Sequence, residues 1–384
     1  MNVAETPPLA LYVHWPFCVS KCPYCDFNSH VRDAVDQVAW RAALLADLAH
    51  EAALLPGRRL GSIFFGGGTP SLMPPETVAA IIDAASAAWP FDDDIEITLE
   101  ANPSSVEAAR FADIARAGVN RVSLGLQALD DDALRFLGRA HGVDEGLAAL
   151  ATAQRAFARV SFDLIYARPE QCLKDWEAEL ARALGFGTEH LSLYQLTIEP
   201  GTRFATDAAA GRLHIPDGDA AADLFEATRA LTKTAGLPAY EISNHARRGA
   251  ESRHNLTYWR YRDYAGIGPG AHGRRGGMAT VRHRKPENWL SAVARNGHGA
   301  QSEERLIPAD RAKEGLLMGL RLREGIDLTR IALLGEAPVA ALVDETAIAR
   351  LADQGFVARA GDHLRVREAG MLLLDAILPA VVAG

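Results

Sequence analysis

Apolar residues along the chain follow two alternating patterns. Short runs rich in β-branched residues end in Gly, Pro or polar residues, and longer stretches between them carry apolar residues at helical spacing. The short runs predict strands over 11–17, 62–65, 95–99, 122–126, 160–165 and 191–196. The longer stretches predict helices over 38–55, 75–89, 105–117, 146–158 and 219–234. This alternation predicts repeated βα units and an α/β fold.

The six predicted strands limit how the sheet can be built. Parallel strands need right-handed crossovers, so the βα units make either an open doubly wound sheet or a partly closed barrel. In both cases we expect functional side chains at the carboxyl ends of the strands.

The last third of the chain has a different pattern. Residues 240–288 are rich in Gly, Arg and aromatic residues with little periodicity, which predicts ordered irregular structure. From about residue 305 compact helices return, and two short alternating runs around Gly361 and Asp362 predict a hairpin. Helices followed by such a hairpin are typical of a small winged-helix-like α+β domain. We therefore divide the chain into a core (1–239), a connecting region (240–304) and a C-terminal domain (305–384).

Composition excludes several classes of protein. With 48% hydrophobic and 23% charged residues the chain is globular, and its net charge of −9 gives no general attraction to nucleic acid. The predicted C-terminal domain has no strong basic excess either, so we expect no nucleic acid partner. The N-terminus lacks the pattern of a secretion signal, and Asp375 and Pro379 interrupt the apolar stretch 371–382. We expect a cytoplasmic protein without a transmembrane segment.

Three of the four cysteines lie within eight residues, directly after the first predicted strand. Cys18, Cys22 and Cys25 form C-x3-C-x2-C in the segment HWPFCVSKCPYCDFNSH. Three thiolates can bind three irons of a cubane cluster and leave the fourth iron open to a small molecule, whereas structural zinc needs four protein ligands. A zinc loop completed by His14 or His30 is the alternative.

The remaining cysteine, Cys172, stands alone at the start of a predicted helix. We expect it to be buried as a small hydrophobic residue and do not assign it to the cluster.

With the aromatic Tyr24, the cysteine motif resembles the signature of the radical S-adenosylmethionine (radical SAM) superfamily. The resemblance implies a [4Fe-4S] cluster on the three cysteines, with S-adenosylmethionine bound to the open iron through its amino and carboxylate groups. In that family a reduced cluster cleaves the sulfonium and yields a 5′-deoxyadenosyl radical. The cofactor then carries the chemistry, and the protein positions it.

The segment Gly66-Gly67-Gly68-Thr69-Pro70 follows the second predicted strand. Glycines let backbone approach a ligand closely, although three glycines in a turn are also a common structural feature. In this position they resemble the family's motif that contacts the methionyl end of the cofactor. Glu100 closes the third predicted strand, where a carboxylate can pair with the methionyl ammonium; a surface Glu before a turn is the simpler interpretation.

Over essentially its whole length the chain is similar to the oxygen-independent coproporphyrinogen III oxidase family. The resemblance implies an S-adenosylmethionine site, with further matches in SLGLQALD, LGRAHG and FDLIYARP that each close or follow a strand. The implied contacts are Tyr12, Gly67, Gly68, Thr69, Glu100, Gln127, Arg139, Asp163 and Ile267.

Two departures separate the chain from the true oxidases of this family. Their cluster loop reads C-x3-C-x2-C-x-C, but the fourth position here is Phe27. They also carry an N-terminal extension, whereas this chain enters its first predicted strand at about residue 11. The segment CDFNSH, residues 25–30, instead resembles the heme chaperone branch of the family.

A second motif supports that branch. His254, Asn255, Tyr258 and Trp259 form H-N-x-x-Y-W in the predicted irregular region. Histidine is a common axial ligand of heme iron, and aromatic side chains line porphyrin faces. The resemblance implies heme binding at His254, Tyr258 and Trp259. Without it, His254 would be interpreted as an ordinary loop or core histidine, and His272 has the same ambiguity.

The sequence therefore favours a heme chaperone that binds heme and transfers it to an acceptor protein. The cluster and S-adenosylmethionine would control or assist that transfer, with a flavodoxin or ferredoxin among the candidate electron donors. The main alternative is a radical enzyme that decarboxylates coproporphyrinogen III to protoporphyrinogen IX, and the third is a zinc-stabilised interaction module. The sequence leaves open the identity of the acceptor, the residue that ligates heme iron, and whether the protein forms a homodimer.

Overall fold

A computed structural model describes residues 6–32 and 34–383. The six predicted strands are all present and pair in parallel in sequence order. They are β1 (Leu9–Trp15), β4 (Leu60–Gly67), β5 (Phe91–Ala101), β6 (Arg121–Gln127), β7 (Arg159–Tyr166) and β8 (His190–Gln195). Their apolar residues are almost completely buried, as is usual for parallel strands with both faces covered.

Helices connect these strands, and most follow the sequence prediction. They are α1 (Gln37–Leu54), α2 (Pro75–Ala88), α3 (Ser105–Ala108), α4 (Phe111–Arg116), α5 (Asp131–Phe136), α6 (Val143–Ala156), α7 (Leu173–Leu184), α8 (Arg203–Ala209) and α9 (Gly218–Thr234). The single helix expected over 105–117 is divided at Ala109 and Arg110. Asp36, Asp130 and Asp217 begin α1, α5 and α9 because each side chain accepts a hydrogen bond from a backbone N–H of the first turn.

The expectation that 240–288 is irregular was wrong. This part of the chain forms β9 (Asn244–Ala246), α10 (Arg253–Trp259), β10 (Tyr264–Ile267), β11 (His272–Arg275), β12 (Met278–Arg282) and the start of α11 (Pro286–Asn296), which β13 (Ala300–Arg305) follows. Strand β10 pairs in parallel with β1, and β11, β12 and β13 continue the sheet with antiparallel pairs. At the opposite edge β9 pairs with β8, which gives an 11-stranded sheet.

The strands β11 and β12 escaped prediction because they bury arginines in place of apolar residues. Arg282 is 0% exposed, and its Nη2 lies 2.6 Å from Oε1 of Glu51 on α1. The Nε of Arg275 lies 3.0 Å from the other oxygen of Glu51. Asp47, one turn earlier on α1, accepts from the backbone of Gly268, close to the end of β10. This charge network holds the added strands against α1, and breaking such a buried pair costs about 3–5 kcal/mol.

A separate hydrophobic cluster forms the small α+β domain near the C-terminus. Its elements are α12 (Pro308–Gly319), β14 (Ile326–Asp327), α13 (Leu328–Gly335), α14 (Glu345–Asp353), β15 (Val357–Ala360), β16 (His363–Val366) and α15 (Leu374–Val381). The predicted hairpin is confirmed as β15 and β16, which turn at Gly361 with a φ of +61°.

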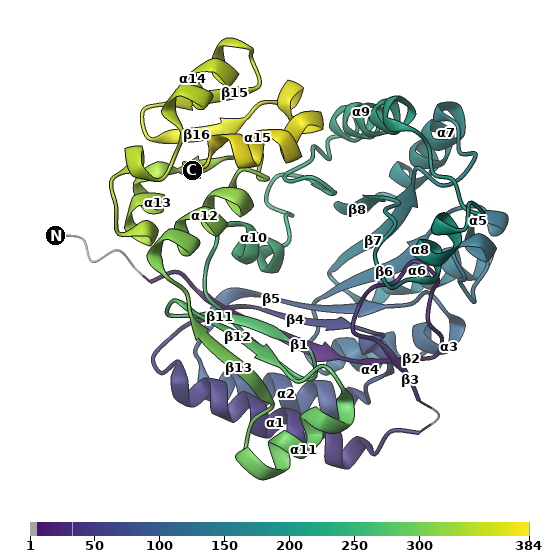
Figure 1. Ribbon diagram of the computed structural model, residues 1–384. Helices are drawn as coiled ribbons and strands as arrows, with labels where there is room; N and C mark the ends of the chain where they lie inside the picture. Colours follow the sequence, from purple (N-terminus) through teal and green to yellow (C-terminus); the bar gives the residue numbers. More distant parts are fainter. Residues whose placement is uncertain (1–5, 33, 384) are drawn as a thin grey trace.

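Figure 1 shows how these parts enclose the interior of the molecule. The large sheet curves, with α1, α2 and α11 on its outer face below β1 and β4. Helix α10 lies on the inner side, above β4 and β1 in this view, and contacts both strands and α12 of the small domain. None of the described helices is long and apolar enough to cross a membrane.

Candidate functional site

The cysteine motif begins at the last residue of β2 (Phe17–Cys18) and continues in the loop that leads to β3 (His30–Val31), which pairs in parallel with β2. Polar groups from other elements approach two of its sulfurs. Thr69 Oγ1 donates to Cys18 Sγ at 3.4 Å, and Arg139 Nη1 donates to Cys22 Sγ at 3.5 Å. Partial burial raises the pKa of both the Cys18 and the Cys25 thiols. The hydrogen bond from Thr69 opposes this shift at Cys18. Donors such as Thr69 and Arg139 stabilise negative sulfur, so the loop can hold thiolate ligands.

The spacing of the three sulfurs favours a cluster over a single metal ion. In the described part of the chain, the Sγ atoms of Cys18, Cys22 and Cys25 do not all lie within 4.8 Å of one another. Tetrahedral zinc with Zn–S bonds of about 2.3 Å would bring its sulfurs to about 3.8 Å. A cubane binds each thiolate through a different iron and therefore needs a wider arrangement.

The histidines of the zinc alternative are also engaged elsewhere. His14 Nε2 is 2.9 Å from the carbonyl oxygen of Asn28, and its Nδ1 is 2.9 Å from the hydroxyl of Tyr12. Burial lowers the pKa of His14 to about 4, so the ring is neutral at pH 7. His30 Nε2 lies 3.2 Å from Oδ1 of Asn28. The residues present therefore fit a [4Fe-4S] cluster better than a zinc ion.

The glycine motif ends β4 directly beside the cysteine loop. A Cβ atom at Gly68 would lie 2.7 Å from the carbonyl oxygen of Phe17 and 3.0 Å from Cys18 Sγ. At Gly67 the backbone adopts a φ of +115°, and a Cβ would lie 2.7 Å from the carbonyl oxygen of Trp15. Glycine is required at both positions because the two loops pack backbone to backbone.

Two acidic residues face the interior from neighbouring strands. Glu100, near the end of β5, accepts a hydrogen bond from the N–H of Gly67 at 3.2 Å. Burial and the like charge of Asp163 raise the pKa of Glu100 to about 8. Asp163 accepts from Ser123 at 3.2 Å, and burial raises its pKa to about 6. Asp163 lies within β7 and not at its end, so the expectation that it closes a strand was wrong in this detail.

The acids share one charged neighbour that sequence reasoning missed. Arg121 at the start of β6 is 3% exposed and contacts the hydroxyl groups of Thr98 and Ser161. Its positive charge lowers the pKa of both acids but does not overcome burial. An arginine within an otherwise apolar strand was the available signal. A carboxylate pair with this little compensation is suited to a cationic ligand group.

The remaining predicted S-adenosylmethionine contacts surround this region. Arg139 donates to Asn102 Oδ1 at 2.6 Å and to the carbonyl oxygen of Gly125 at 2.9 Å, besides Cys22. Gln127 ends β6 with a φ of +72°, and its buried Oε1 has no hydrogen-bond partner among the described residues. Ile267 is fully buried on β10 beside Val13 of β1.

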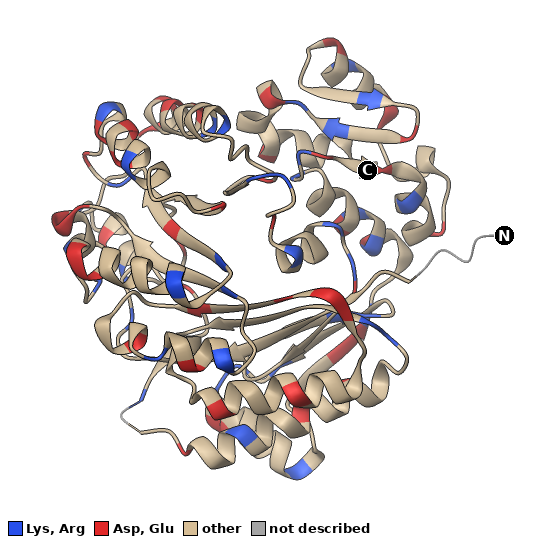
Figure 2. Ribbon diagram, turned by 180° about the vertical axis from the view of Figure 1, so that it is seen from behind, with Lys and Arg blue, Asp and Glu red and all other residues tan. Residues whose placement is uncertain are grey.

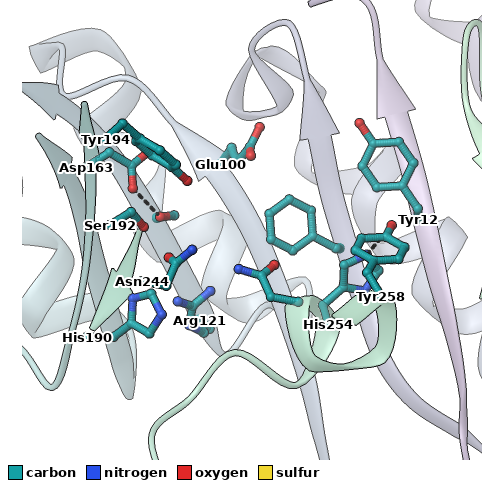
Figure 3. Close-up of a pocket in the computed structure, with 13 residues that line it drawn as sticks. Tyr12, Glu100, Arg121, Asp163, His190, Ser192, Tyr194, Asn244, His254 and Tyr258 are labelled. Carbon is teal, nitrogen blue, oxygen red and sulfur yellow. Dashed lines mark hydrogen bonds between the residues drawn. The ribbon is translucent and has the colours of Figure 1, made fainter. Parts of the chain in front are cut away.

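A small cavity of about 200 Å³ lies on the inner face of these strands. Figure 3 shows Glu100, Asp163 and Arg121 on one side and Tyr12, His254 and Tyr258 on the other. Its full lining is Tyr12, Phe64, Glu100, Arg121, Ser123, Asp163, His190, Ser192, Tyr194, Asn244, His254, Asn255 and Tyr258.

His254 is buried on α10 with both ring nitrogens engaged. Its Nδ1 lies 3.1 Å from Ser62 Oγ, and its Nε2 lies 2.7 Å from the Tyr258 hydroxyl. The ring stacks on Phe64 with centroids 4.9 Å apart. Burial lowers the pKa of His254 to about 3, so the imidazole is neutral. In this arrangement an iron atom can bind His254 only if one of the two hydrogen bonds opens.

A larger cavity of about 670 Å³ connects the cofactor residues with the rest of the H-N-x-x-Y-W motif. This volume is within the range of small-molecule sites. The lining residues are Tyr12, His14, Phe27, Asn28, Gly67, Glu100, Tyr194, Glu241, Ser243, Asn244, Asn255, Tyr258, Trp259, Tyr264, Gly270, His272, Arg284 and Met318. Trp259 and the exposed His272 therefore face the same space as Gly67 and Glu100.

Two family models match the chain. The Radical SAM superfamily model matches residues 12–183, and the HemN C-terminal domain model matches residues 306–373. The mitochondrial radical S-adenosyl methionine domain-containing protein 1 of Bos taurus is 44% identical over 326 residues, which are 83% of this chain and 74% of that protein. Heme chaperone HemW of Escherichia coli is 44% identical over 274 residues, 71% of each chain.

The chain belongs to the radical SAM superfamily. Within it, the relatives assign the chain to the HemW branch of the oxygen-independent coproporphyrinogen III oxidase family. The crystal structure of coproporphyrinogen III oxidase HemN from Escherichia coli matches with a TM-score of 0.81 over 98% of this chain and 90% of that chain. At 23% identity this likeness shows the fold alone.

Asn28, which sequence reasoning did not single out, connects the cysteine loop with two distant segments. Its Nδ2 donates to the carbonyl oxygens of Pro269 and Arg284, both at 2.9 Å. A Cβ at Gly270 would lie 2.4 Å from that same nitrogen. Asn28 thus ties the end of the cysteine loop to the turn after β10.

Cys172 does not have the predicted role. It is exposed, it precedes the first residue of α7, and its Sγ lies 2.9 Å from Asp175 Oδ2. The prediction of burial was wrong because a helix start on the outside of a radical SAM barrel is open to solvent.

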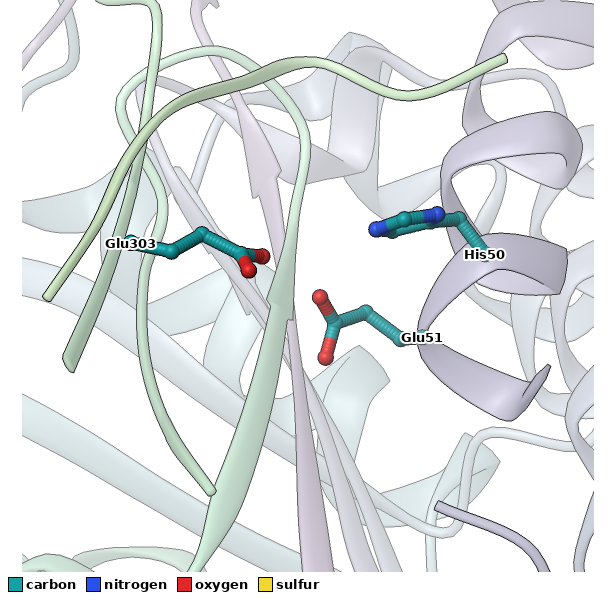
Figure 4. Close-up of side chains that lie close together, drawn as sticks. All are labelled: His50, Glu51 and Glu303. Carbon is teal, nitrogen blue, oxygen red and sulfur yellow. The ribbon is translucent and has the colours of Figure 1, made fainter. Parts of the chain in front are cut away.

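A second cluster of metal-binding residue types lies on the outer side of the sheet. His50, Glu51 and Glu303 bring ligand atoms within 4.8 Å of one another, as Figure 4 shows. Arg275 contacts both glutamates, and Arg282 contacts the second oxygen of Glu51. Because guanidinium groups already neutralise the carboxylates, we assign this cluster to the structural charge network on α1.

Proposed function

We propose that this radical SAM protein binds heme and transfers it to an acceptor protein in the cytoplasm. The observation that carries the proposal is the large cavity, in which residues of the expected S-adenosylmethionine site adjoin residues of the H-N-x-x-Y-W motif. The chain's similarity to Escherichia coli heme chaperone HemW supports the same function.

In this proposal Cys18, Cys22 and Cys25 hold a [4Fe-4S] cluster. The cluster with S-adenosylmethionine supplies one-electron chemistry when both are bound. Thr69 and Arg139 stabilise the thiolates through the contacts to Cys18 and Cys22 described above. Glu100 binds the amino group of S-adenosylmethionine beside the glycine turn. These residues orient the cofactor and leave the larger part of the cavity open to a second ligand.

We assign heme to the large cavity, with aromatic side chains against the porphyrin and Arg284 near its propionates. His272 would bind the heme iron in this assignment, because it lines the cavity and remains accessible to a ligand there. Partial desolvation and the charge of Arg284 lower the pKa of His272, which favours the neutral ligating form. His254 supports the cavity wall through its hydrogen bond to Tyr258. Trp259 lines the large cavity together with Asn255 and Tyr258 of the same motif.

Anaerobic reconstitution with iron and sulfide tests the proposal. We expect the wild type to bind one heme with a Soret band, and to pass it to apomyoglobin used as a stand-in acceptor. A triple variant with Cys18, Cys22 and Cys25 replaced by Ser should lose iron, sulfide and the broad charge-transfer absorption, since a hydroxyl is a poor ligand for this metal. Cys172→Ser is the matched control and should keep them.

A parallel assay separates the chaperone from the enzyme. Coproporphyrinogen III, reductant and S-adenosylmethionine are added to the reconstituted protein without oxygen. Stoichiometric release of carbon dioxide would show that the protein is the decarboxylating oxidase and would reject the chaperone function. Absence of heme binding by the wild type would reject the chaperone directly, and retention of full iron and sulfide by the triple variant would reject the cluster ligands.

A further inference from the structure

A third cavity, of about 350 Å³, lies between α9 of the large domain and the small C-terminal domain. It is separate from the two cavities of the functional site and shares none of their lining residues. Its lining consists of Arg229, Lys233, Pro238, Ala239, Arg323, Arg365, Val366, Arg367, Glu368 and Met371. Five of these ten side chains are cationic and one is acidic.

The cations come from three separate parts of the fold. Arg229 and Lys233 lie one turn apart on α9, so they project from the same face of that helix. Arg365 and Arg367 are two residues apart at the end of the β15–β16 hairpin and share one face of it. Arg323 follows α12. Basic residues are visible on both sides of this boundary in Figure 2.

Arg229 distinguishes this cavity from a solvated charged surface. Its side chain belongs to a residue that is only 8% exposed. Its Nε and Nη1 are buried and have no hydrogen-bond partner among the described residues. Burying a guanidinium without an acceptor is unfavourable, and surface arginines avoid it by extending into water. Arg229 lines the cavity, so an anion bound there would supply the acceptors that these two nitrogens lack.

The acids nearby balance this charge only in part: burial lowers the pKa of Arg229 overall, although Glu368 and Glu241, which lies outside the lining, act in the opposite direction. Glu368 contacts Lys233 at 3.1 Å and is the single acidic residue of the lining, so five cations and one anion leave a net charge of +4. The whole chain, in contrast, carries a net charge of −9. A concentration of positive charge against the overall sign, in a cavity of this size with the buried Arg229 among its lining residues, matches a small ligand with several negative charges and not an extended polyanion.

We propose that this cavity binds a small molecule carrying a diphosphate group. Planar guanidinium groups bind phosphate oxygens in pairs, and a diphosphate with about three negative charges compensates most of the +4 lining. Because the ligand contacts α9 and the hairpin together, it stabilises the contact between the large domain and the small domain. The proposal is independent of the heme assignment, since it involves other residues.

Calorimetric titration of the full chain with sodium pyrophosphate tests the site. We expect saturable binding of one pyrophosphate per chain, weakened by added salt. The double variant Arg365→Ala/Arg367→Ala removes two exposed cations without touching the core and should weaken binding about tenfold or more. Arg229→Gln should weaken it similarly. Arg247→Ala/Arg248→Ala removes the same charge outside the cavity and should leave the Kd within about twofold.

Three results would overturn the proposal. The first is no saturable binding of pyrophosphate by a wild type that is folded by circular dichroism. The second is an equal loss of affinity in the Arg247/Arg248 control, which would indicate nonspecific attraction. The third is equal or tighter binding of citrate, which would replace phosphate by carboxylate as the recognised group. Heme binding and iron content of the Arg365/Arg367 variant should match the wild type, so the test is unaffected by failure of the heme assignment.

Discussion

Glu100 lines the interior cavities near the end of β5, where the N–H of Gly67 is 3.2 Å from one carboxyl oxygen. Burial and the neighbouring Asp163 raise its pKa to about 8, although Gly67 and Arg121 act in the opposite direction. At pH 7 most of the ligand-free protein therefore carries a protonated Glu100. A cationic ligand group has to displace this proton, so ligand binding and proton release are linked.

We predict that the affinity for S-adenosylmethionine increases as pH rises from 6 to 8. Below a pKa of about 8 the ionised fraction of Glu100 grows about tenfold per pH unit. Calorimetry at several pH values on reconstituted protein measures the Kd. In Glu100→Gln the affinity should be lower and nearly independent of pH over this range. An unchanged Kd, or the same pH profile in the variant, would contradict the role of Glu100.

The stability of the ligand-free protein depends on the same proton, but it decreases with rising pH where the affinity increases. Because the folded pKa of Glu100 is raised from 4.5 to about 8, its contribution to stability is complete below about pH 4.5 and is lost as pH rises through 8. Above about pH 8 Glu100 is ionised and can bind a cation, but in that pH range it contributes least to the stability of the ligand-free protein.

At the residue scale, the sequence predicted motifs whose residues lie close together in the chain, but not contacts between residues that lie far apart in it. The spacing of Cys18, Cys22 and Cys25 lies within eight residues, so the sequence displays it directly. The clamp at Asn28 depends on Pro269, which is 241 residues away. No local pattern indicates that pair. The exposure of Cys172 was missed for the same reason, since burial depends on which elements pack over a helix start.

Strands were predicted where the elements bury apolar residues on both faces. β4 and β7 are rich in apolar residues because helices cover the outer face of the sheet, although Asp163 of β7 lines the inner cavity. β11 and β12 lack such runs, since Arg275 and Arg282 take the buried positions and pair with Glu51 of α1. When the charges of a strand are neutralised by a carboxylate on a distant helix, the sequence of that strand has the same polar pattern as a loop.

Helix α10 makes the assignment of the heme ligand testable at the element scale. We predict that His272→Ala shifts the Soret maximum, because the variant removes the proposed iron ligand. His254→Ala should weaken heme binding without that shift, because it removes the support of the Tyr258 hydroxyl. Absorbance titrations with heme measure both effects, and iron–sulfur content should be unchanged in both variants.

Tyr258→Phe provides the matched control for α10. This variant frees His254 Nε2 from its 2.7 Å hydrogen bond and leaves the ring in place. If His254 is the iron ligand, Tyr258→Phe should strengthen heme binding and His272→Ala should leave the Soret maximum unchanged. That combination would transfer the ligand assignment from His272 to His254.

At the scale of the whole molecule, the fold brings two ligand sites into one interior. The small and large cavities have six lining residues in common, namely Tyr12, Glu100, Tyr194, Asn244, Asn255 and Tyr258. These come from β1, β5, β8, β9 and α10, which are distributed from the first strand to the connecting region. Neither half of the chain builds this interior alone, which is why the βα pattern predicted the α/β fold but not the cavity.

We predict that S-adenosylmethionine and heme bind cooperatively because they share these walls. S-adenosylmethionine has a sulfonium and carries net positive charge, whereas the propionates make heme anionic, so each attracts the other within one cavity of low dielectric. Couplings between linked sites are typically about 1–3 kcal/mol, so saturating S-adenosylmethionine should lower the heme Kd about fivefold or more.

Linkage requires heme to lower the Kd of S-adenosylmethionine by the same factor. Measuring both constants anaerobically on one preparation checks this reciprocity, and Glu100→Gln should reduce the coupling by weakening the first ligand's contact with the shared wall. Competition between the two ligands would show instead that they occupy the same space, and independent binding would place heme outside the large cavity.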